Sequence, residues 1–407
     1  MDEGSTAGTR PGDKLYEREA ELAALSRALA AARSGAGGLV LLEGPAGIGK
    51  SRLLAEARAR ADALGMTTLT ARGIDLERDA SFGVAADLFG AALAEAPGRA
   101  RLLSGQAALA TALFYPMTGA AVPPAVPPSA DPSADPSALV RGLYWLTVNV
   151  AAESSPGAGT GGLLIEVDDA QWVDRPSLTY LAHLAARIDE LPAVLVIAVR
   201  SGEQATDRPT LNWLRDRSGN GLLRPRALSP EAVGQLARAE LPAAEPAFTR
   251  ACAEVSDGNP FLATELLRAL RADGIAPTAG SVARVRSLVP DSVLRAVLVR
   301  LARLGEPAEM LAKAVAVLGN RAPMRQARLL TSLDAAQAEQ AADALASAHI
   351  LAPGEPLRFT HPLIATSVYA DIPAFARARA HRSAAELLAA EGAAQDVVVA
   401  QLLLTRP

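Results

Sequence analysis

Cysteine is almost absent from this 407-residue chain. Cys252 is the only one, so no disulfide can form within the chain, and disulfide-scaffolded secreted proteins are excluded. The first fourteen residues are polar and do not resemble a secretory signal. The uncharged stretch 102–130 is broken by prolines and glycines, which leaves no continuous apolar run long enough for a membrane span. We therefore expect a cytoplasmic protein with no membrane partner.

Aromatic residues are also scarce, at 4% of the chain, whereas apolar residues make up 50%. Alanine and leucine must therefore build the cores, and this composition favours helices. The length is sufficient for two or three domains with separate cores. The net charge of −4 argues against a broad nucleic-acid-binding surface.

Lysine is the third scarce residue, with only Lys14, Lys50 and Lys313 among 40 basic residues. Lys50 belongs to GPAGIGKS, which fits the P-loop pattern G-x-x-x-x-G-K-[ST] between an expected strand and an expected helix. Glycines let backbone N–H groups surround phosphate oxygens, and the following helix presents its positive end. A compact ammonium reaches the β and γ oxygens, where the wider guanidinium of arginine would not fit. The loop is thus predicted to bind ATP or ADP through Gly44, Pro45, Ala46, Gly47, Ile48, Gly49, Lys50, Ser51 and Arg52.

Short apolar runs separated by helical stretches predict a five-stranded parallel sheet with helices on both faces. The fold class expected is an α/β P-loop NTPase core, followed by an all-helical lid and a winged-helix domain. The winged helix is inferred from four helices, of which 334–347 is the third main one, closed by a hairpin within 349–361. The expected strands lie at 39–43, 67–71, 163–168, 194–199 and 222–227.

Acidic residues end the third expected strand, LLIEVD, which is followed directly by a second aspartate. A carboxylate and a hydroxyl are suitable Mg²⁺ ligands, so Asp168 and Ser51 are the candidate metal-binding residues. Asp169 is the candidate catalytic residue that orients or polarises the attacking water. Arg200 ends the fourth strand at the same sheet edge and would sense the γ-phosphate, although an exposed strand-end arginine is the alternative. Glu166 lies inside the apolar strand, where a buried carboxylate needs a partner. Either it pairs with an arginine or its side chain points toward the metal site.

The motifs together resemble the STAND class of P-loop ATPases, and within it the large ATP-binding LuxR-family (LAL) regulators. The resemblance extends over about residues 14–405. It rests on LYEREAEL (15–22), GPAGIGKSRLL, YWLTVNVAAE, LLIEVDDAQWVDRPSLTYL, VLVIAVR, DGNPFLATELL, VPDSVLRAVLVRLARLG and FTHPLIATSVY.

The resemblance implies further nucleotide contacts outside the P-loop. Arg18 would lie on the adenine side, Asn259 and Pro260 would form the lid motif, and His361 would contact the ADP β-phosphate, although a helix-capping histidine is as plausible. Glu17 stands where the family usually has glycine before the arginine. The implied domains are a disordered tail at 1–13, an ATPase domain at 14–235 with a Pro-rich loop at 122–138, a helical lid at 236–285, a winged helix at 286–375 and the start of a truncated helical sensor region at 376–407.

The function implied is an ATPase of slow regulatory turnover that switches between an ADP-closed and an ATP-open state, with ATP or ADP and Mg²⁺ as cofactors. Its expected partners are an inducer, bound through a C-terminal region that this chain lacks, and further copies of itself in the ATP state. Direct DNA binding is not expected, because the helix at 334–347 contains no Lys or Arg. The rival readings are a P-loop small-molecule kinase or another metabolic NTPase, and a scaffold that binds no nucleotide.

Overall fold

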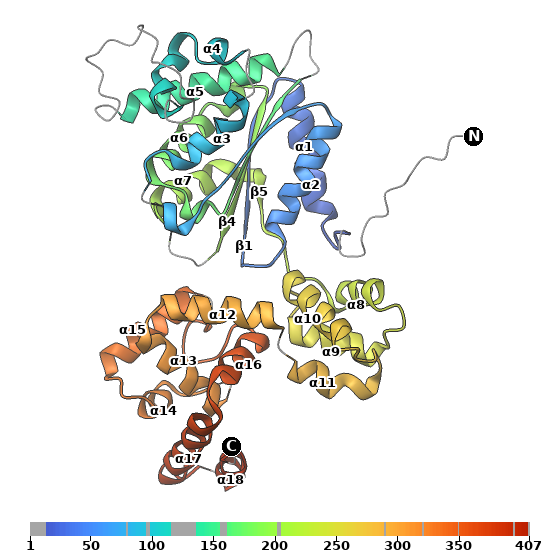
Figure 1. Ribbon diagram of the computed structural model, residues 1–407, viewed down its shortest axis with the longest axis vertical. Helices are drawn as coiled ribbons and strands as arrows, with labels where there is room; N and C mark the ends of the chain where they lie inside the picture. The colour runs from blue at the N-terminus through green and yellow to red at the C-terminus, as the bar shows by residue number, and fades with distance from the viewer. Residues whose placement is uncertain are drawn as a thin grey trace. The chain divides into compact units, whose positions relative to one another are not determined.

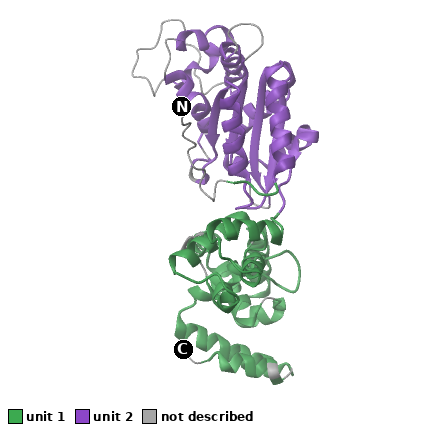
Figure 2. Ribbon diagram, turned by 90° about the vertical axis from the view of Figure 1, so that its right-hand side faces the viewer, with its two compact units in different colours: residues 1–17, 227–407 green, residues 18–226 purple. Residues whose placement is uncertain are grey.

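The computed structural model describes residues 14–405, except 79, 95–97, 115–135, 155–160, 202–204, 289, 320, 349 and 394. The chain divides into two compact units (Figure 2). Unit 2 is residues 18–226, and unit 1 comprises residues 227–407 together with 1–17. The expected N-terminal tail and all but the last three residues of the expected Pro-rich loop lie outside the described residues.

Unit 2 is built around a parallel sheet of five strands in the order β2-β3-β4-β1-β5. This confirms the expected five-stranded parallel sheet. The edge strand β5 contains only two residues, whereas the sequence suggested 222–227; Pro225 lacks the N–H that would continue the ladder. The strands are β1 Gly38–Gly44, β2 Thr67–Arg72, β3 Leu163–Asp168, β4 Ala193–Arg200 and β5 Leu222–Leu223.

Helices cover both faces of this sheet (Figure 1). α1 and α2 contact one face, and α3, α5, α6 and α7 enclose a Leu-, Ile- and Val-rich core on the other. The described helices of unit 2 are α1 Glu19–Arg33, α2 Lys50–Ala63, α3 Gly83–Ala94, α4 Arg99–Leu102, α5 Pro136–Glu153, α6 Arg175–Ala185 and α7 Arg208–Ser218.

Buried Asp174 fixes the entry to two of these helices. Its carboxylate accepts a 2.9 Å hydrogen bond from the Ser177 amide, which caps α6. The same carboxylate accepts hydrogen bonds from the amides of Phe82 (3.0 Å) and Val84 (3.2 Å) at the start of α3. Asp174 therefore ties the segment that follows β2 to the turn that follows β3.

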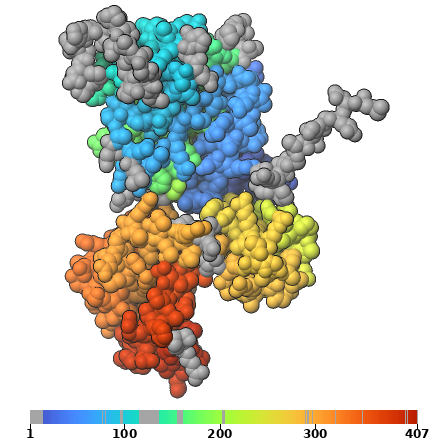
Figure 3. Space-filling model, viewed as in Figure 1, coloured from blue at the N-terminus to red at the C-terminus, as the bar shows by residue number. Residues whose placement is uncertain are grey.

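The described part of unit 1 is almost entirely helical, with a core of Ala, Leu and Val side chains. In the space-filling view, α12 to α15 form a continuous orange surface (Figure 3). Its helices are α8 Pro230–Glu240, α9 Pro246–Ser256, α10 Pro260–Ala272, α11 Val282–Ser287, α12 Asp291–Arg303, α13 Glu306–Leu318, α14 Met324–Leu329, α15 Ala335–Ser347, α16 Pro362–Asp371, α17 Ala374–Ala390 and α18 Gln395–Leu403.

The expected hairpin within 349–361 is reduced to isolated antiparallel bridges. Leu351 pairs with Phe359, and Leu357 pairs with Ala322 ahead of α14. The Ala352 amide also donates to the Arg358 carbonyl at 2.8 Å. None of the helices in the described residues has the length and apolarity that a bilayer crossing requires.

Candidate nucleotide site

The P-loop connects β1 to α2 at the carboxyl edge of the sheet. Gly47 and Gly49 have φ values of 78° and 104°, a region that residues with a side chain rarely adopt. Glycine at these positions lets the loop turn back over the end of β1. The exposed Arg52 follows in the first turn of α2, and the Ile48 side chain is buried.

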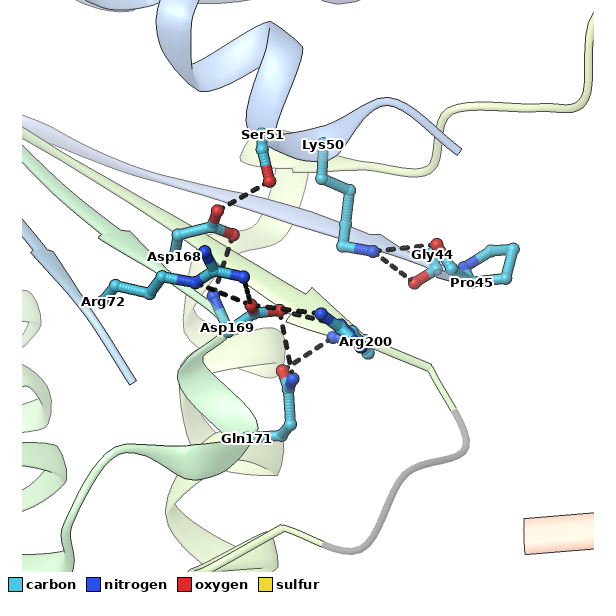
Figure 4. Close-up of polar contacts among 9 residues, drawn as sticks. All are labelled: Gly44, Pro45, Lys50, Ser51, Arg72, Asp168, Asp169, Gln171 and Arg200. Carbon is cyan, nitrogen blue, oxygen red and sulfur yellow. Dashed lines mark hydrogen bonds and ion pairs between the residues drawn. The ribbon is translucent and has the colours of Figure 1, made fainter. Parts of the chain in front are cut away.

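Lys50 is the first residue of α2 and is only 6% exposed. Its ammonium donates hydrogen bonds to the carbonyls of Gly44 (2.8 Å) and Pro45 (2.9 Å). The side chain therefore arches across its own loop, as Figure 4 shows. A compact, flexible ammonium can make these bonds and still reach a phosphate oxygen, which explains lysine here in an arginine-rich chain.

Ser51 and Asp168 lie together, as expected for a shared metal ion. The Ser51 hydroxyl donates to Asp168 Oδ2 at 2.6 Å, and the Asp169 amide donates to Asp168 Oδ1 at 2.8 Å. A hydroxyl and a carboxylate are hard oxygen ligands of the kind that Mg²⁺ prefers alongside phosphate oxygens and water. These two residues would hold Mg²⁺, which neutralises phosphate charge when bound.

Asp169 follows β3 and is 3% exposed, with a left-handed backbone at φ 50°. Arg72, at the end of β2, donates to its Oδ2 through Nε (3.0 Å) and Nη2 (2.7 Å). Arg200, at the end of β4, donates through Nε to Oδ1 (2.8 Å) and through Nη2 to Oδ2 (3.2 Å). Gln171 adds a 3.2 Å hydrogen bond to Oδ1 (Figure 4). The carboxylate is thus held between two guanidinium groups.

Two opposing effects act on the pKa of Asp169. Burial raises it, but the charge of Arg200 and the hydrogen bonds from Arg72, Arg200 and Gln171 outweigh burial and leave the pKa below its usual value. A carboxylate of low pKa is a weak proton acceptor, and here its oxygens already accept five hydrogen bonds. A water molecule bound by Asp169 would have to compete with Arg72, Arg200 and Gln171 for its oxygens.

Arg200 faces the site from β4, the strand that lies between β1 and β3. Its guanidinium lies 4.6 Å from the ring centroid of Trp172, and its backbone amide donates to Gln171 Oε1 at 3.0 Å. Sequence reasoning missed both Gln171 and Arg72. Arg72 could have been noticed from the sequence, because TTLTAR and VLVIAVR are both expected strands that end in arginine.

Of the two alternatives for the buried Glu166, the structure shows the pairing with an arginine. Arg58 of α2 donates to Glu166 Oε2 through Nε (3.0 Å) and Nη2 (2.8 Å). Oε1 accepts no hydrogen bond from any described residue. Burial raises the pKa of Glu166 to about 6, although Arg58 opposes the shift.

The remaining predicted site residues are Arg18, Asn259, Pro260 and His361. Arg18 belongs to unit 2 and donates to the carbonyl of Ile48 in the P-loop (3.2 Å). The other three belong to unit 1. Asn259 caps α10 by accepting from the amides of Phe261 and Leu262, with Pro260 as the first helical residue.

His361 caps α16 and is buried. Its Nδ1 accepts from the Leu363 amide at 3.3 Å, so Nε2 carries the proton and donates to the Ser256 carbonyl at 2.6 Å. Burial lowers the pKa of His361, against the opposing effects of that carbonyl and of Asp257. The histidine thus joins the end of α9 to the start of α16, and the helix-capping reading of His361 describes its contacts.

The fold and the site together define a P-loop ATPase core. Ser51 and Asp168 meet beside a glycine loop, and a buried lysine arches over that loop at the edge of a parallel sheet. Residues 14–197, a little less than half of the chain, match the family model described as an AAA ATPase domain.

The whole chain is also similar to solved structures at low sequence identity. A Walker-type ATPase of Pyrococcus abyssi shares 16% identity over 88% of this chain and 97% of that one, with a TM-score of 0.49. The ORC2 protein of Aeropyrum pernix shares 15% over 96% and 98%, with a TM-score of 0.46. A STAND protein with a tetratricopeptide repeat sensor from Pyrococcus horikoshii shares 15% over 93% and 47%, with a TM-score of 0.34. No curated protein sequence matches the chain.

Proposed function

We propose that this chain is the ATP-binding and slowly hydrolysing signal-transduction module of a LuxR-type (LAL) transcriptional regulator. ATP or ADP binds at the P-loop with Mg²⁺, and the chain alternates between an ADP-closed and an ATP-open state. The observation that carries the nucleotide assignment is the 2.6 Å contact of Ser51 with Asp168, next to the buried Lys50. The regulatory role rests on the resemblance of the sequence motifs to that family.

Slow turnover is supported by the environment of Asp169. This carboxylate would orient the attacking water, but Arg72, Arg200 and Gln171 occupy its oxygens. Hydrolysis therefore waits for a rearrangement that frees the carboxylate, and Arg200 is then available to the γ-phosphate. A nucleotide that is hydrolysed slowly can report a state, because its lifetime on the protein is long.

The proposed switch assigns the other partners. The open state would self-associate, and an inducer would reach the chain through a region C-terminal to it. Asn259 and Pro260 are the proposed lid motif, and residues 286–375 are the proposed winged helix. DNA reading is not assigned to this chain, since α15 exposes Glu339 and Asp343, follows the exposed N-cap Asp334 and contains no Lys or Arg.

Calorimetric titration of Lys50→Arg tests the proposal. Wild-type chain should bind ADP and ATP in the presence of Mg²⁺, and Lys50→Arg should weaken both by about ten- to a hundredfold, because a charge-assisted contact to phosphate is lost. Lys313→Arg is the matched control; Lys313 pairs with Glu309 and Asp371 in unit 1 and should leave affinity unchanged.

A phosphate-release assay on the same proteins separates the rival functions. Slow release of inorganic phosphate from ATP in water supports the switch. Wild-type affinity in Lys50→Arg would contradict the site, and transfer of phosphate to a small-molecule acceptor at a much higher rate would favour a kinase.

A further inference from the structure

The chain passes between its two units twice, once at Glu17–Arg18 and once at Arg226–Ala227. Hydrogen bonds tie these two passages together within each unit. On the unit 1 side, Glu17 binds Ser229, and on the unit 2 side, Arg18 donates to the Arg226 carbonyl at 2.7 Å. The adjacent residues Glu17 and Arg18 therefore each bind a residue near the second passage, one in unit 1 and one in unit 2.

Glu17 holds a backbone conformation that glutamate rarely adopts. Its φ is 52°, in the left-handed region that favours glycine. Its carboxylate accepts the Ser229 amide at 2.8 Å and the Ser229 hydroxyl at 2.6 Å. Ser229 caps α8, so a negative charge lies at the positive end of that helix. These contacts offset the strain at Glu17.

Arg18 is 3% exposed and is aimed at the P-loop. The same Nη2 that donates to Arg226 also donates to the Ile48 carbonyl, at 3.2 Å. Ile48 O and Gly49 N belong to one trans peptide plane, in which the C=O and the N–H point in opposite directions. A guanidinium on the Ile48 carbonyl therefore fixes and polarises the Gly49 N–H, a donor of the loop that surrounds the phosphate.

We propose that Glu17 and Arg18 form a clasp that sets the phosphate affinity of the P-loop, and that this affinity depends on the hydrogen bonds between Glu17 and Ser229. Arg18 is a positioning residue that acts through the Ile48–Gly49 peptide, and Glu17 is a positioning residue that holds Arg18 between Ile48 and Arg226. The inference deepens the proposed nucleotide binding and rests on it. It assigns Arg18 to the phosphate side of the nucleotide, whereas the family resemblance implies a contact on the adenine side.

The clasp continues into the turn that carries Asn259. The Leu228 amide, two residues beyond Arg226, donates to the Gly258 carbonyl at 2.8 Å. A Cβ on Gly258 would lie 2.2 Å from the Leu228 carbonyl oxygen, so the two backbones are in direct contact. The residues just before α8 are therefore joined to the turn just before α10 within unit 1.

Base preference distinguishes a phosphate-side role from an adenine contact. Arg18→Gln in the full chain should weaken ADP and GDP by the same factor, about tenfold, in competition with a fluorescent ADP analogue. Arg27→Gln is the control, since Arg27 is exposed on the same helix. A loss of the ADP-over-GDP preference in Arg18→Gln, or no loss beyond that of Arg27→Gln, overturns the proposal.

Hydrogen exchange tests the coupling through Glu17. In wild-type chain, ADP should slow amide exchange in residues 226–233. Glu17→Gly fits the left-handed backbone but removes the carboxylate, so this protection by ADP should be lost. Glu17→Gln should restore it, because the amide can still accept the Ser229 N–H and donate to its hydroxyl.

A purely structural role of Glu17 would change exchange equally with and without ADP, and that outcome overturns the clasp. So does a wild-type chain that binds ADP with no change at 226–233. A wild-type chain that binds no nucleotide would overturn the proposed function and the clasp together, and is recognised because the binding titration itself fails.

Discussion

Ser51 donates a 2.6 Å hydrogen bond to Asp168 although 117 residues separate the two in the chain. One lies in the first turn of α2 and the other ends β3. Since β4 separates β1 from β3 in the sheet, this contact crosses over a strand to bring the hydroxyl and the carboxylate together. The contact between Ser51 and Asp168, the proposed metal ligands, therefore depends on the position of β4 between β1 and β3.

Asp168→Asn should remove most of the Mg²⁺ dependence of nucleotide binding. An amide is a poorer ligand than a carboxylate for a hard cation, and the negative charge at the metal is lost. Calorimetry with ATP, with and without Mg²⁺, measures the difference; the two affinities should approach one another. A Mg²⁺ effect as large as that of the wild type would remove Asp168 from the metal site.

Asp169→Asn should retain nucleotide and reduce turnover by about a hundredfold, because the charged oxygens that would orient the attacking water are lost. The free energy of unfolding should also fall, by about 1–3 kcal/mol, because Arg72 and Arg200 lose their shared counter-ion. Phosphate release and urea denaturation provide the two measurements. Asp189→Asn, which alters an ion pair with Arg217 elsewhere in unit 2, is the control; equal turnover in both variants would exclude the role.

Arg58→Leu should destabilise unit 2 by about 1–3 kcal/mol in urea at pH 7.5, because the buried Glu166 carboxylate loses its partner. The double variant Arg58→Leu/Glu166→Leu should recover most of that loss, since an apolar pair needs no desolvation. If the double variant is as unstable as Arg58→Leu, packing of the Arg58 stem and not its charge is what matters.

Gly73→Ala should disturb the turn that carries Asp169. A Cβ at this position would lie 2.5 Å from the Asp169 carbonyl oxygen and 2.9 Å from the Val173 nitrogen, both of them backbone atoms that cannot yield freely. We expect a loss of about 1–3 kcal/mol in stability, together with reduced phosphate release. Gly38→Ala, where no neighbouring atom lies within 4 Å of the added Cβ, should be nearly neutral. Equal effects in the two variants would contradict the close packing at Gly73.

Unit 1 should lose stability as the pH falls below about 6.5. The folded pKa of His361 is lowered, so the unfolded chain binds more protons between the folded value and the ordinary value of 6.5. Stability is therefore full above 6.5 and declines below it, until the folded histidine also becomes protonated. His361→Asn can still cap α16 and should flatten this part of the profile in thermal unfolding between pH 5 and pH 8. A profile identical to that of the wild type would exclude His361 as its cause.

The strands and the phosphate loop could be predicted because their signals are local. Each of the five expected strands overlaps an observed one, and GPAGIGKS joins β1 to α2. The order of the strands is not a local property, and it is the order that brings Arg72 and Arg200 to either side of Asp169. Asp169 could therefore be recognised as an acid next to the metal site, but not as one that two arginines already hold.

Glu17 is a second case in which local reasoning was insufficient. From the sequence, Glu17 in place of the usual glycine suggests a weakened adenine-side motif. Its stabilising hydrogen bonds come from Ser229, which lies 212 positions away in the chain. Only the fold supplies that partner. The same is true of Arg58, whose position on α2 faces Glu166 of β3.

The position of β4 between β1 and β3 has a consequence for biosynthesis. During translation, the phosphate loop, Asp168 and Asp169 are synthesised before β4, Ala193–Arg200. The nascent chain therefore contains these motifs while the central strand of the sheet is still missing. Until that strand emerges, β1 and β3 have no common neighbour to align them, and Ser51 cannot meet Asp168. Nucleotide binding should therefore begin only after β4 has left the exit tunnel. Bound ATP would then stabilise the completed sheet during translation.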